Sequence, residues 1–390
     1  MKKGLILGAI LLANLGFSQS APTTTGVQDP QTQENAINRI LSGNVSGGVT
    51  VGGYGEVTYG EPEGSSLGEI DVQRLVLLFG YNFNEDTQFV TEIEFEHVNE
   101  VFVEQAFIQH RLADNFNLRA GLMLVPMGII NEYHEPTTFN GVFRPSIDKS
   151  IIPTTWREVG VGATGNFTDI SLRYQAYIFN GFISNTAAGS KFLGGANSLR
   201  NGRQKGAKSV ANSMNFSTKL DYYGTKGLRL GLSAYHGETS PEDETEAVKV
   251  GSTVDLTMAA FDYRYKLNNF TTRGQYIFTD INGSSDYNAL TSSDLGSQMQ
   301  GFYLEAAYNL LPAENIKKLD AFVRYENYNT HHNVDGIAVN DSYHRKEWTT
   351  GLSYHVAPGA VFKADYQIKG NEEVGNENSG KLNLGIGVWF

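Results

Sequence analysis

Several short segments are apolar at every second position, and a charged residue lies at one of the positions between. In LRYQAYI the charge is Arg173, and in FNLRAGLML it is Arg119. This period of two is typical of β-strands with one polar and one apolar face. Fixed charges on the polar face would attract or repel dissolved ions. The chemistry that these residues predict is electrostatic recognition of a charged solute rather than the breaking of a bond.

The same phase turns a mixed set of charges onto the polar face. A charge on the apolar face would cost about 2–4 kcal/mol at the middle of a bilayer, so this phase is strongly preferred. The polar-face charges are Arg119, Arg173, Lys219, Arg229, Arg273, Arg324 and Lys363, with Glu92, Glu94, Glu96, Asp221, Glu305, Asp320, Glu326, Glu347 and Asp365.

The start of the chain has the pattern of an export signal. Two lysines precede a short apolar run, and small residues follow it. The run is too short to cross a bilayer as a helix. We therefore predict a signal peptide over residues 1–18 and a polar periplasmic leader over residues 19–47, in which NAINRILSG can form one short helix. Residues 48–390 are predicted to form a single domain.

Composition narrows the possible classes of that domain. The 390 residues include 22 Phe and 20 Tyr but no cysteine, and mean hydropathy is only −0.29. Many aromatics at low mean hydropathy are typical of strands that are apolar on one face only. The 42 acidic residues outnumber the 30 basic ones. We therefore expect no nucleic acid partner.

Alternation predicts about sixteen strands between residues 48 and 390. The connections between them are short at one set of ends, such as ADNF and APG, and long at the other. Short turns on one rim and long loops on the other are typical of a transmembrane antiparallel β-barrel. A soluble β-sandwich has no reason to separate its loops by length. The sequence therefore predicts an all-β outer-membrane barrel, wide enough for an aqueous channel.

The loop at 126–155 differs from the others in composition. It carries four of the ten prolines and eight large apolar residues. Because so many apolar groups need cover, we expect the loop to fold into the barrel and narrow it. The alternative is a loop that packs on the outer rim or on a neighbouring subunit. Folding inward would bring the following charged groups near the narrowest point: Glu132, Glu135, Arg144, Asp148, Lys149 and Arg157.

A second loop, at 183–212, is locally positive. Five of its residues are basic, and the wider segment 170–220 contains no acidic residue. A positive mouth would raise the local concentration of anions. The alternative is a solvated, Gly-rich loop whose charges have no specific role.

Several stretches resemble the phosphate-selective porin O/P family of Gram-negative outer membranes. They are GGYGEVTY, VEQAFIQHRL followed by LRAGLMLVPMGI, and GVFRPSIDKSIIPTTWREVGVGATG, and the resemblance extends over residues 48–390. It implies a 16-stranded barrel, a homotrimer and the passage of small anions. Phosphate selectivity in that family depends on an arginine ladder and a lysine cluster on the inward loop. Here that loop has only Arg144 and Lys149. The terminal Phe390 also resembles the signal that the barrel assembly machinery recognises.

Other candidate sites have weaker patterns. His331 and His332, with Asp335, Asp341 and His344, lack zinc-type spacing and are expected in a mobile external loop. The acidic run that begins at Glu242 is interpreted as a solvated loop. A barrel lipase would need a lipid-facing Ser–His pair, which the phase does not provide. We therefore expect no metal, no cofactor and no enzymatic activity.

Three functions remain for such a barrel. The leading hypothesis is a passive outer-membrane pore for small hydrophilic solutes, surrounded by outer-membrane lipid. The second is a structural or assembly subunit of a larger complex, with a plugged lumen. The third is a secreted carbohydrate-binding β protein. A steady single-channel current separates the first from the second, and the need for detergent separates both from the third.

Overall fold

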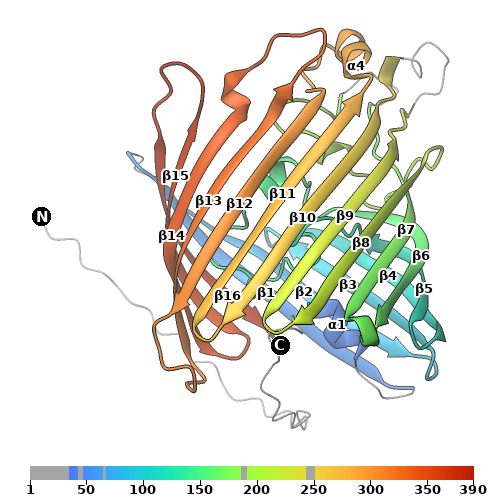
Figure 1. The fold of residues 1–390 in the computed structure, drawn as a ribbon, viewed down its shortest axis with the longest axis vertical. Coiled ribbons are helices and arrows are strands. Elements are labelled where there is room, and N and C mark those ends of the chain that lie inside the picture. Colours follow the sequence, from blue (N-terminus) through green and yellow to red (C-terminus); the bar gives the residue numbers. More distant parts are fainter. Residues whose placement is uncertain (1–34, 43–46, 65–66, 186–190, 243–250) are drawn as a thin grey trace, which may run out of the picture.

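The computed structural model describes residues 35–42, 47–64, 67–185, 191–242 and 251–390, and they form a closed antiparallel barrel (Figure 1). The predicted signal peptide and residues 19–34 of the leader lie outside the described residues. Each strand pairs with its neighbours in sequence, and β1 closes the barrel against β16, with Tyr54 opposite Trp389. The predicted sixteen-stranded barrel is therefore confirmed.

The observed strands follow the alternation in the sequence closely. β7 begins three residues later than predicted, because residues 168–170 form a 3₁₀ turn and Ser171 has a φ of 53°. The strands are β1 Val49–Pro62, β2 Glu69–Asn82, β3 Thr87–Glu96, β4 Glu100–Ala113, β5 Phe116–Leu124, β6 Arg157–Phe167, β7 Leu172–Asn180, β8 Met214–Thr225, β9 Leu228–Glu238, β10 Asp255–Leu267, β11 Phe270–Asn282, β12 Gln298–Asn309, β13 Lys318–Asn333, β14 His344–Ala357, β15 Ala360–Asn371 and β16 Ser379–Trp389.

Connections of unequal length separate the two rims of the barrel. The rim with long loops carries helix α4, and the rim with short turns lies beside the C-terminus (Figure 1). No helix within the described residues is long and apolar enough to cross a membrane. The helices are α1 Ala36–Leu41, α2 Ile147–Ser150 and α4 Ser284–Thr291, with 3₁₀ turns η1 Thr168–Ile170, η2 Arg200–Gly202 and η3 Asp341–Tyr343.

The two faces of the wall have opposite character. Leu118 and Ile178 point outward and are 40% and 47% exposed, whereas Lys219 and Arg324 point inward and are almost completely buried. Outward apolar side chains suit a lipid environment. The buried charges are shielded by other parts of the chain that occupy the lumen.

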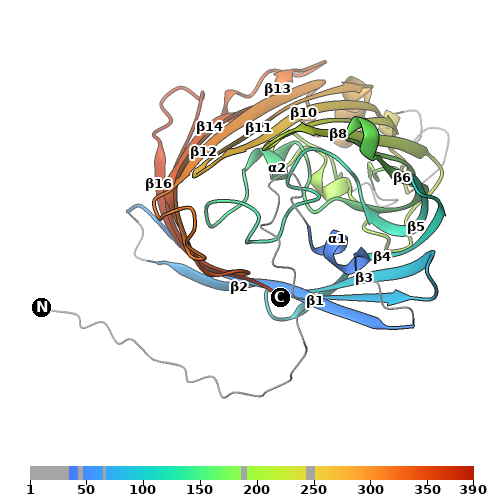
Figure 2. The same ribbon diagram turned by 60° about the horizontal axis from the view of Figure 1, so that its bottom comes forward.

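Two segments fill much of the lumen, as the view toward the short-turn rim shows (Figure 2). One is the inward loop, residues 125–156, which connects β5 to β6 and contains α2. The expectation that this loop folds into the barrel is met: Ile129, Ile130 and Ile151 are completely buried there. The other segment is α1, which lies against β1, β2 and β3.

Candidate functional site

The inward loop crosses the barrel and is held by one side of its wall. Strands β7 to β9 and β11 to β15 all supply polar side chains that contact it. Gln275 of β11, for example, accepts a hydrogen bond from the Ile129 amide at 2.8 Å and donates one to Asp148 at 3.0 Å. The other contacting side chains are Gln175, Lys219, Ser233, Arg273, Glu305, Arg324, Glu326, Glu347, Lys363 and Asp365.

Most of the strand charges predicted to line a pore therefore contact the inward loop or another charge of the wall. The Lys219 ammonium lies 2.8 Å from the Glu132 carboxylate of the inward loop. Carboxylates of the wall neutralise three arginines: Arg229 pairs with Asp221 of the neighbouring β8 at 3.0 Å, Arg273 with Glu305 of the neighbouring β12 at 2.6 Å, and Arg324 with Glu326 of its own strand at 3.0 Å. These groups face the lumen as the phase predicts. Their charges are balanced within the wall and the loop, which leaves little net field from them.

The structure does not bring together all the charges predicted at the narrowest point. Arg144, Asp148 and Lys149 line one cavity on the long-loop side of the inward loop. Glu132 lies on the opposite side, and the Glu135 carboxylate accepts a hydrogen bond from the backbone of α1. Arg157 is buried in the wall, 3.8 Å from Glu104. The predicted cluster is thus divided by the loop itself.

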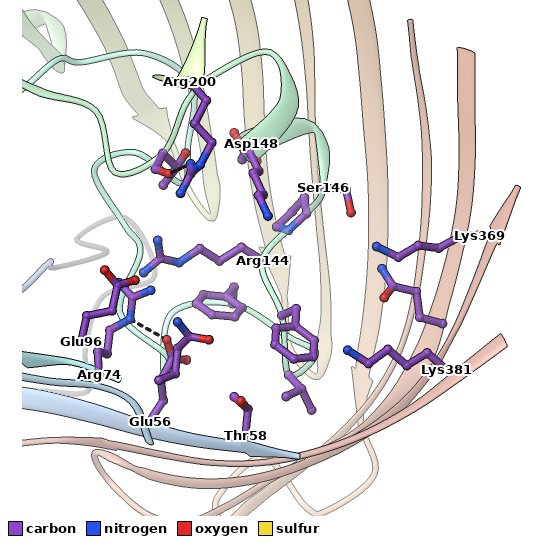
Figure 3. Close-up of a pocket in the computed structure, with 18 residues that line it drawn as sticks. Glu56, Thr58, Arg74, Glu96, Arg144, Ser146, Asp148, Arg200, Lys369 and Lys381 are labelled. Carbon is purple, nitrogen blue, oxygen red and sulfur yellow. Dashed lines mark hydrogen bonds and ion pairs between the residues drawn. The ribbon is translucent and has the colours of Figure 1, made fainter. Parts of the chain in front are cut away.

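A cavity of about 360 Å³ opens above the inward loop, and we call it the cationic cavity (Figure 3). Its walls come from the loop, from the loop after β7 and from β1, β2, β3, β15 and β16. Six basic residues line it against three acidic ones. They are Arg74, Arg144, Lys149, Arg200, Lys369 and Lys381, with Glu56, Glu96 and Asp148.

Four of the six cations form no ion pair with any residue that the structure describes. Within the described part of the chain, no carboxylate lies within 4.0 Å of the charged groups of Arg144, Lys149, Arg200 or Lys381. The Arg144 Nε atom is buried and has no hydrogen-bond partner. Arg144 extends across the middle of the cavity (Figure 3). An unpaired donor at this position is suited to an anion that enters the cavity.

The loop cations of the cavity repel one another. Burial, and after it the charge of Arg200, lowers the pKa of Lys149 below its ordinary value. Burial, and after it the charge of Arg144, lowers the pKa of Arg200 to about 10. Arg200 therefore remains charged at neutral pH. A bound anion would relieve this repulsion, which makes the cavity electrostatically suited to anions.

The sequence interpretation did not include three of the cations that line this cavity. Lys369 shares its strand face with Lys363, and Lys381 shares its face with the inward Asn383, so extending the phase would have found both. Arg74 follows the same rule, but the next inward residues on β2, Val76 and Leu78, are apolar and obscure it. Arg200 belongs to the positive 183–212 loop.

That positive loop has two roles in the structure. Arg203 donates hydrogen bonds to the carbonyl oxygens of Pro153 and Thr155, both at 2.9 Å, and so holds the end of the inward loop. Arg200 also contacts the carbonyl of Thr154 and lines the cationic cavity. Lys208 is exposed. Part of the positive segment therefore contributes to the cavity, and part is solvated.

Helix α1 covers the lumenal face of the first three strands. Ile37 and Ile40 are buried there, in one apolar cluster with Val76, Leu78 and Val90. A Cβ atom on Gly80 would lie 2.3 Å from the Ile40 side chain, so the close approach of the helix requires glycine at that position. Beside α1 lies a small second cavity, which is lined by Arg119 and Arg173 among others.

The histidines at the long-loop rim do not form the metal site that was considered. The expectation of a mobile external loop is wrong for His331 and His332, because β13 extends to Asn333 and contains both. The His331 Nε2 atom lies 2.6 Å from the carbonyl oxygen of Asp294, and His344 contacts Asn327 instead. Of the acidic run, only Glu242 falls within the described residues.

Comparison with known proteins identifies a relative. An uncharacterized protein of Aquifex aeolicus (strain VF5) is 35% identical over 336 residues, which cover 83% of this chain and 76% of the relative. No family model matches the chain.

Solved structures with the same fold are outer-membrane barrels. Salmonella typhi OmpF in complex with daunomycin has a TM-score of 0.57 at 13% identity, covering 88% of this chain and 97% of that one. The outer membrane channel DcaP of Acinetobacter baumannii and the trimer form of OmpT of Vibrio cholerae each have a TM-score of 0.56 at 10% identity, covering 89% of this chain and all of theirs. At such identities the likeness shows the fold alone.

Proposed function

The chain belongs to the same family as the uncharacterized Aquifex aeolicus protein, and from its porin-like barrel we propose that it is an outer-membrane channel for small anions. The observation that carries the proposal is the cationic cavity, with four basic side chains that pair with no carboxylate of the described ranges. The fold supports a channel for small solutes, and the cavity supports the preference for negative ones.

The distribution of charge resolves an apparent contradiction in the sequence. The chain is acidic overall, and many carboxylates face the lumen, which would favour cations. Ion pairs within the wall neutralise most of these carboxylates, including Glu305 and Asp221. The unpaired charge that remains lies in a narrow, partly dry space, where it acts through a lower effective dielectric than in bulk water. Anions therefore gain more from the cavity than cations gain from the wall.

Inorganic phosphate is the solute class we propose to test first. The Arg144 guanidinium has a free Nε donor, and a second guanidinium, Arg200, lines the same cavity. Guanidinium groups recognise phosphate oxygens through paired N–H donors. The phosphate-selective porins that the sequence resembles have a lysine cluster on the inward loop. In this cavity, arginines and strand lysines supply the positive charge instead. We therefore expect anion preference with moderate discrimination among anions.

The decisive experiment reverses two charges of the inward loop. In planar bilayers with a salt gradient, the wild type should give a reversal potential of the sign expected for anion preference. The double variant Arg144→Glu/Lys149→Glu should shift the reversal potential toward cation preference. Lys226→Glu/Lys317→Glu makes the same net change at exposed lysines outside the cavity and should leave the potential nearly unchanged.

Two outcomes would contradict the proposal. An open channel whose reversal potential ignores Arg144→Glu/Lys149→Glu would mean that ions pass elsewhere. A folded barrel without current would favour the alternative of a structural subunit with a plugged lumen. The observation that supports this alternative is the filling of the lumen by α1 and the inward loop (Figure 2).

We also propose that the barrel lies in a Gram-negative outer membrane as a homotrimer. The apolar outward face supports the membrane location, and the trimer form of Vibrio cholerae OmpT supports the assembly. Outer-membrane lipid and the barrel assembly machinery are then its expected partners. Light scattering of the detergent-solubilised protein, corrected for bound detergent, would give one or three chains per particle.

A further inference from the structure

Four side chains from four separate segments converge beneath the inward loop, and we call them the His134 cluster. They are Tyr54 of β1, Glu92 of β3, Glu104 of β4 and His134 of the inward loop. All four are at most 2% exposed. Their converging atoms are the Tyr54 hydroxyl, one carboxylate oxygen from each glutamate and the His134 Nε2 atom. Nothing in the anion channel requires such a group, because it lines neither cavity.

The spacing of these atoms is close to that of a metal coordination shell. The His134 Nε2 atom is 3.6 Å from Glu104 Oε2 and 4.0 Å from Glu92 Oε1. The Tyr54 hydroxyl is 2.9 Å from Nε2, 2.8 Å from the Glu92 oxygen and 3.4 Å from the Glu104 oxygen. Ligands about 2.0 Å from a tetrahedral zinc ion are roughly 3.3 Å apart. Small side-chain shifts would bring all four atoms into that arrangement.

The surroundings also orient the ligands as a metal site requires. The His134 Nδ1 atom lies 3.2 Å from the Asn131 carbonyl oxygen, which fixes the ring if Nδ1 carries the proton and leaves the Nε2 lone pair directed at the cluster. The Gln105 amide donates to Glu92 Oε2 at 2.7 Å and holds that carboxylate in place. Both ligand types thus have the outer hydrogen bonds that accompany metal ligands in proteins.

The charge of the cluster calls for a cation. Two buried carboxylates converge on a tyrosine and a histidine, and burying such charges is costly unless they are paired. Glu104 Oε1 is buried without a hydrogen-bond partner, and the Arg157 guanidinium is 3.8 Å from it, near the limit of an ion pair. A divalent ion would balance both carboxylates at once.

We propose that the His134 cluster binds a divalent first-row transition metal, which ties the inward loop to strands β1, β3 and β4. Imidazole nitrogen with carboxylate and phenol oxygens suits zinc, manganese or iron, and it disfavours soft ions that prefer sulfur. Within the described residues, the polar contacts of β1, β3 and β4 with the inward loop all go to His134. The metal would therefore secure the loop on the side where hydrogen bonds are few.

The test uses the folded full-length mature barrel in detergent, stripped with a chelator and dialysed against zinc. We expect one tightly bound zinc ion per chain by elemental analysis, and a cobalt derivative with the intense visible bands of four-coordinate geometry. His134→Gln and Glu104→Gln should each raise the dissociation constant for zinc at least tenfold. His110→Ala and Glu100→Gln replace an exposed histidine and an exposed carboxylate near the cluster in sequence and should bind as the wild type does.

Each other outcome overturns the proposal. Stripped wild type that takes up no zinc or cobalt has no such site. Equal binding in His134→Gln and Glu104→Gln would place the metal elsewhere on the protein. Heat-modifiable migration in gels shows that each variant is folded, so loss of binding is not mistaken for loss of the barrel. Zinc should also raise the urea midpoint of the wild type but not of Glu104→Gln. Anion conduction plays no part in these readouts.

Discussion

The two halves of the lumenal wall hold the interior of the barrel by different means. From β7 to β15 the wall is polar, and its charged side chains contact the inward loop directly, as Lys219 and Asp365 do. From β1 to β3 the end of the wall nearest the short turns is apolar, and α1 packs there against Val76 and Leu78. Hydrogen bonds and ion pairs thus fix the position of the inward loop on the polar half, whereas shape and burial hold α1 on the apolar half.

The difference shows where a net field can arise. Lumenal charges of the polar half are paired with the loop or with each other, so they act mainly as structural anchors. The unpaired cations Arg144, Lys149 and Arg200 belong to loops, and Lys381 lies toward the long-loop end of β16. Function is therefore expected to follow the loops and strand ends, and stability the middle of the wall.

Removing an ion pair of the polar half should have the largest effect, a loss of stability toward unfolding. Lys219→Met removes the cation that Glu132 and Asp262 share and leaves both carboxylates buried, which costs about 3–5 kcal/mol. Urea unfolding followed by tryptophan fluorescence measures the loss. Lys226→Met, at an exposed lysine just after the same strand, is the matched control. Equal midpoints for the two variants would show that the wall pairs are dispensable.

Breaking the apolar half should have a smaller and more local effect. Ile40→Ala should weaken the docking of α1 by about 2 kcal/mol, the low end for a buried isoleucine because the helix can shift. A helix of six residues does not persist without packing, so it should leave the lumen part of the time. Single-channel recordings should show higher mean conductance. Ile316→Ala, at an exposed turn, should match the wild type, and unchanged conductance in both would mean that α1 does not obstruct ions.

A pH test sharpens the distinction within the cationic cavity. Burial raises the pKa of Asp148 to about 7, although its hydrogen bond from Gln275 opposes the shift. Below pH 7 the carboxyl is neutral and anion preference should be stronger; above pH 7 its charge should weaken the preference. Asp148→Asn should keep the low-pH value at every pH. The charged or titratable groups that face Asp148 are Asp262, Arg273, Tyr303, Arg324 and Glu326.

The smallest effect is expected outside both halves of the wall. Lys205→Glu/Lys208→Glu changes two charges of the loop after β7 that do not line the cationic cavity. Their field reaches the pore only through solvent, where the Debye length is about 10 Å at 0.1 M salt. The anion preference should fall slightly at low salt and recover at 1 M. A shift that persists at 1 M would mean that these lysines lie on the ion path.

Alternation was sufficient to predict the barrel but not the positions of the segments inside its lumen. The phase of strands such as β5 and β8 depends only on local sequence, because each lumenal or outward face repeats every second residue. The partners of Lys219 and Asp365 lie 87 and 223 residues away on the inward loop, and no local pattern predicts such pairs. The divided positions of Glu132 and Lys149 follow from the same long-range contacts.

The sequence does contain one local indication of the apolar half of the wall. The run LVLLF on β2 is apolar on both faces, unlike strands with a solvated lumenal face. A strand that is apolar on both sides must be covered on both sides. Its lumenal residues Val76 and Leu78 indicate that something apolar lies inside the barrel there. The sequence NAINRILSG contains the matching residues Ile37 and Ile40, but it is too short to reveal where its helix docks.

The position of α1 links its docking to the closure of the barrel. The helix rests on β1, β2 and β3, and its Arg39 guanidinium lies 4.7 Å from the centre of the Trp389 ring on β16. β1 and β16 are the strands that close the barrel, so α1 spans the seam between them. Its complete docking surface exists only after the seam has formed. The contact between Arg39 and Trp389 therefore requires that β1 and β16 are paired.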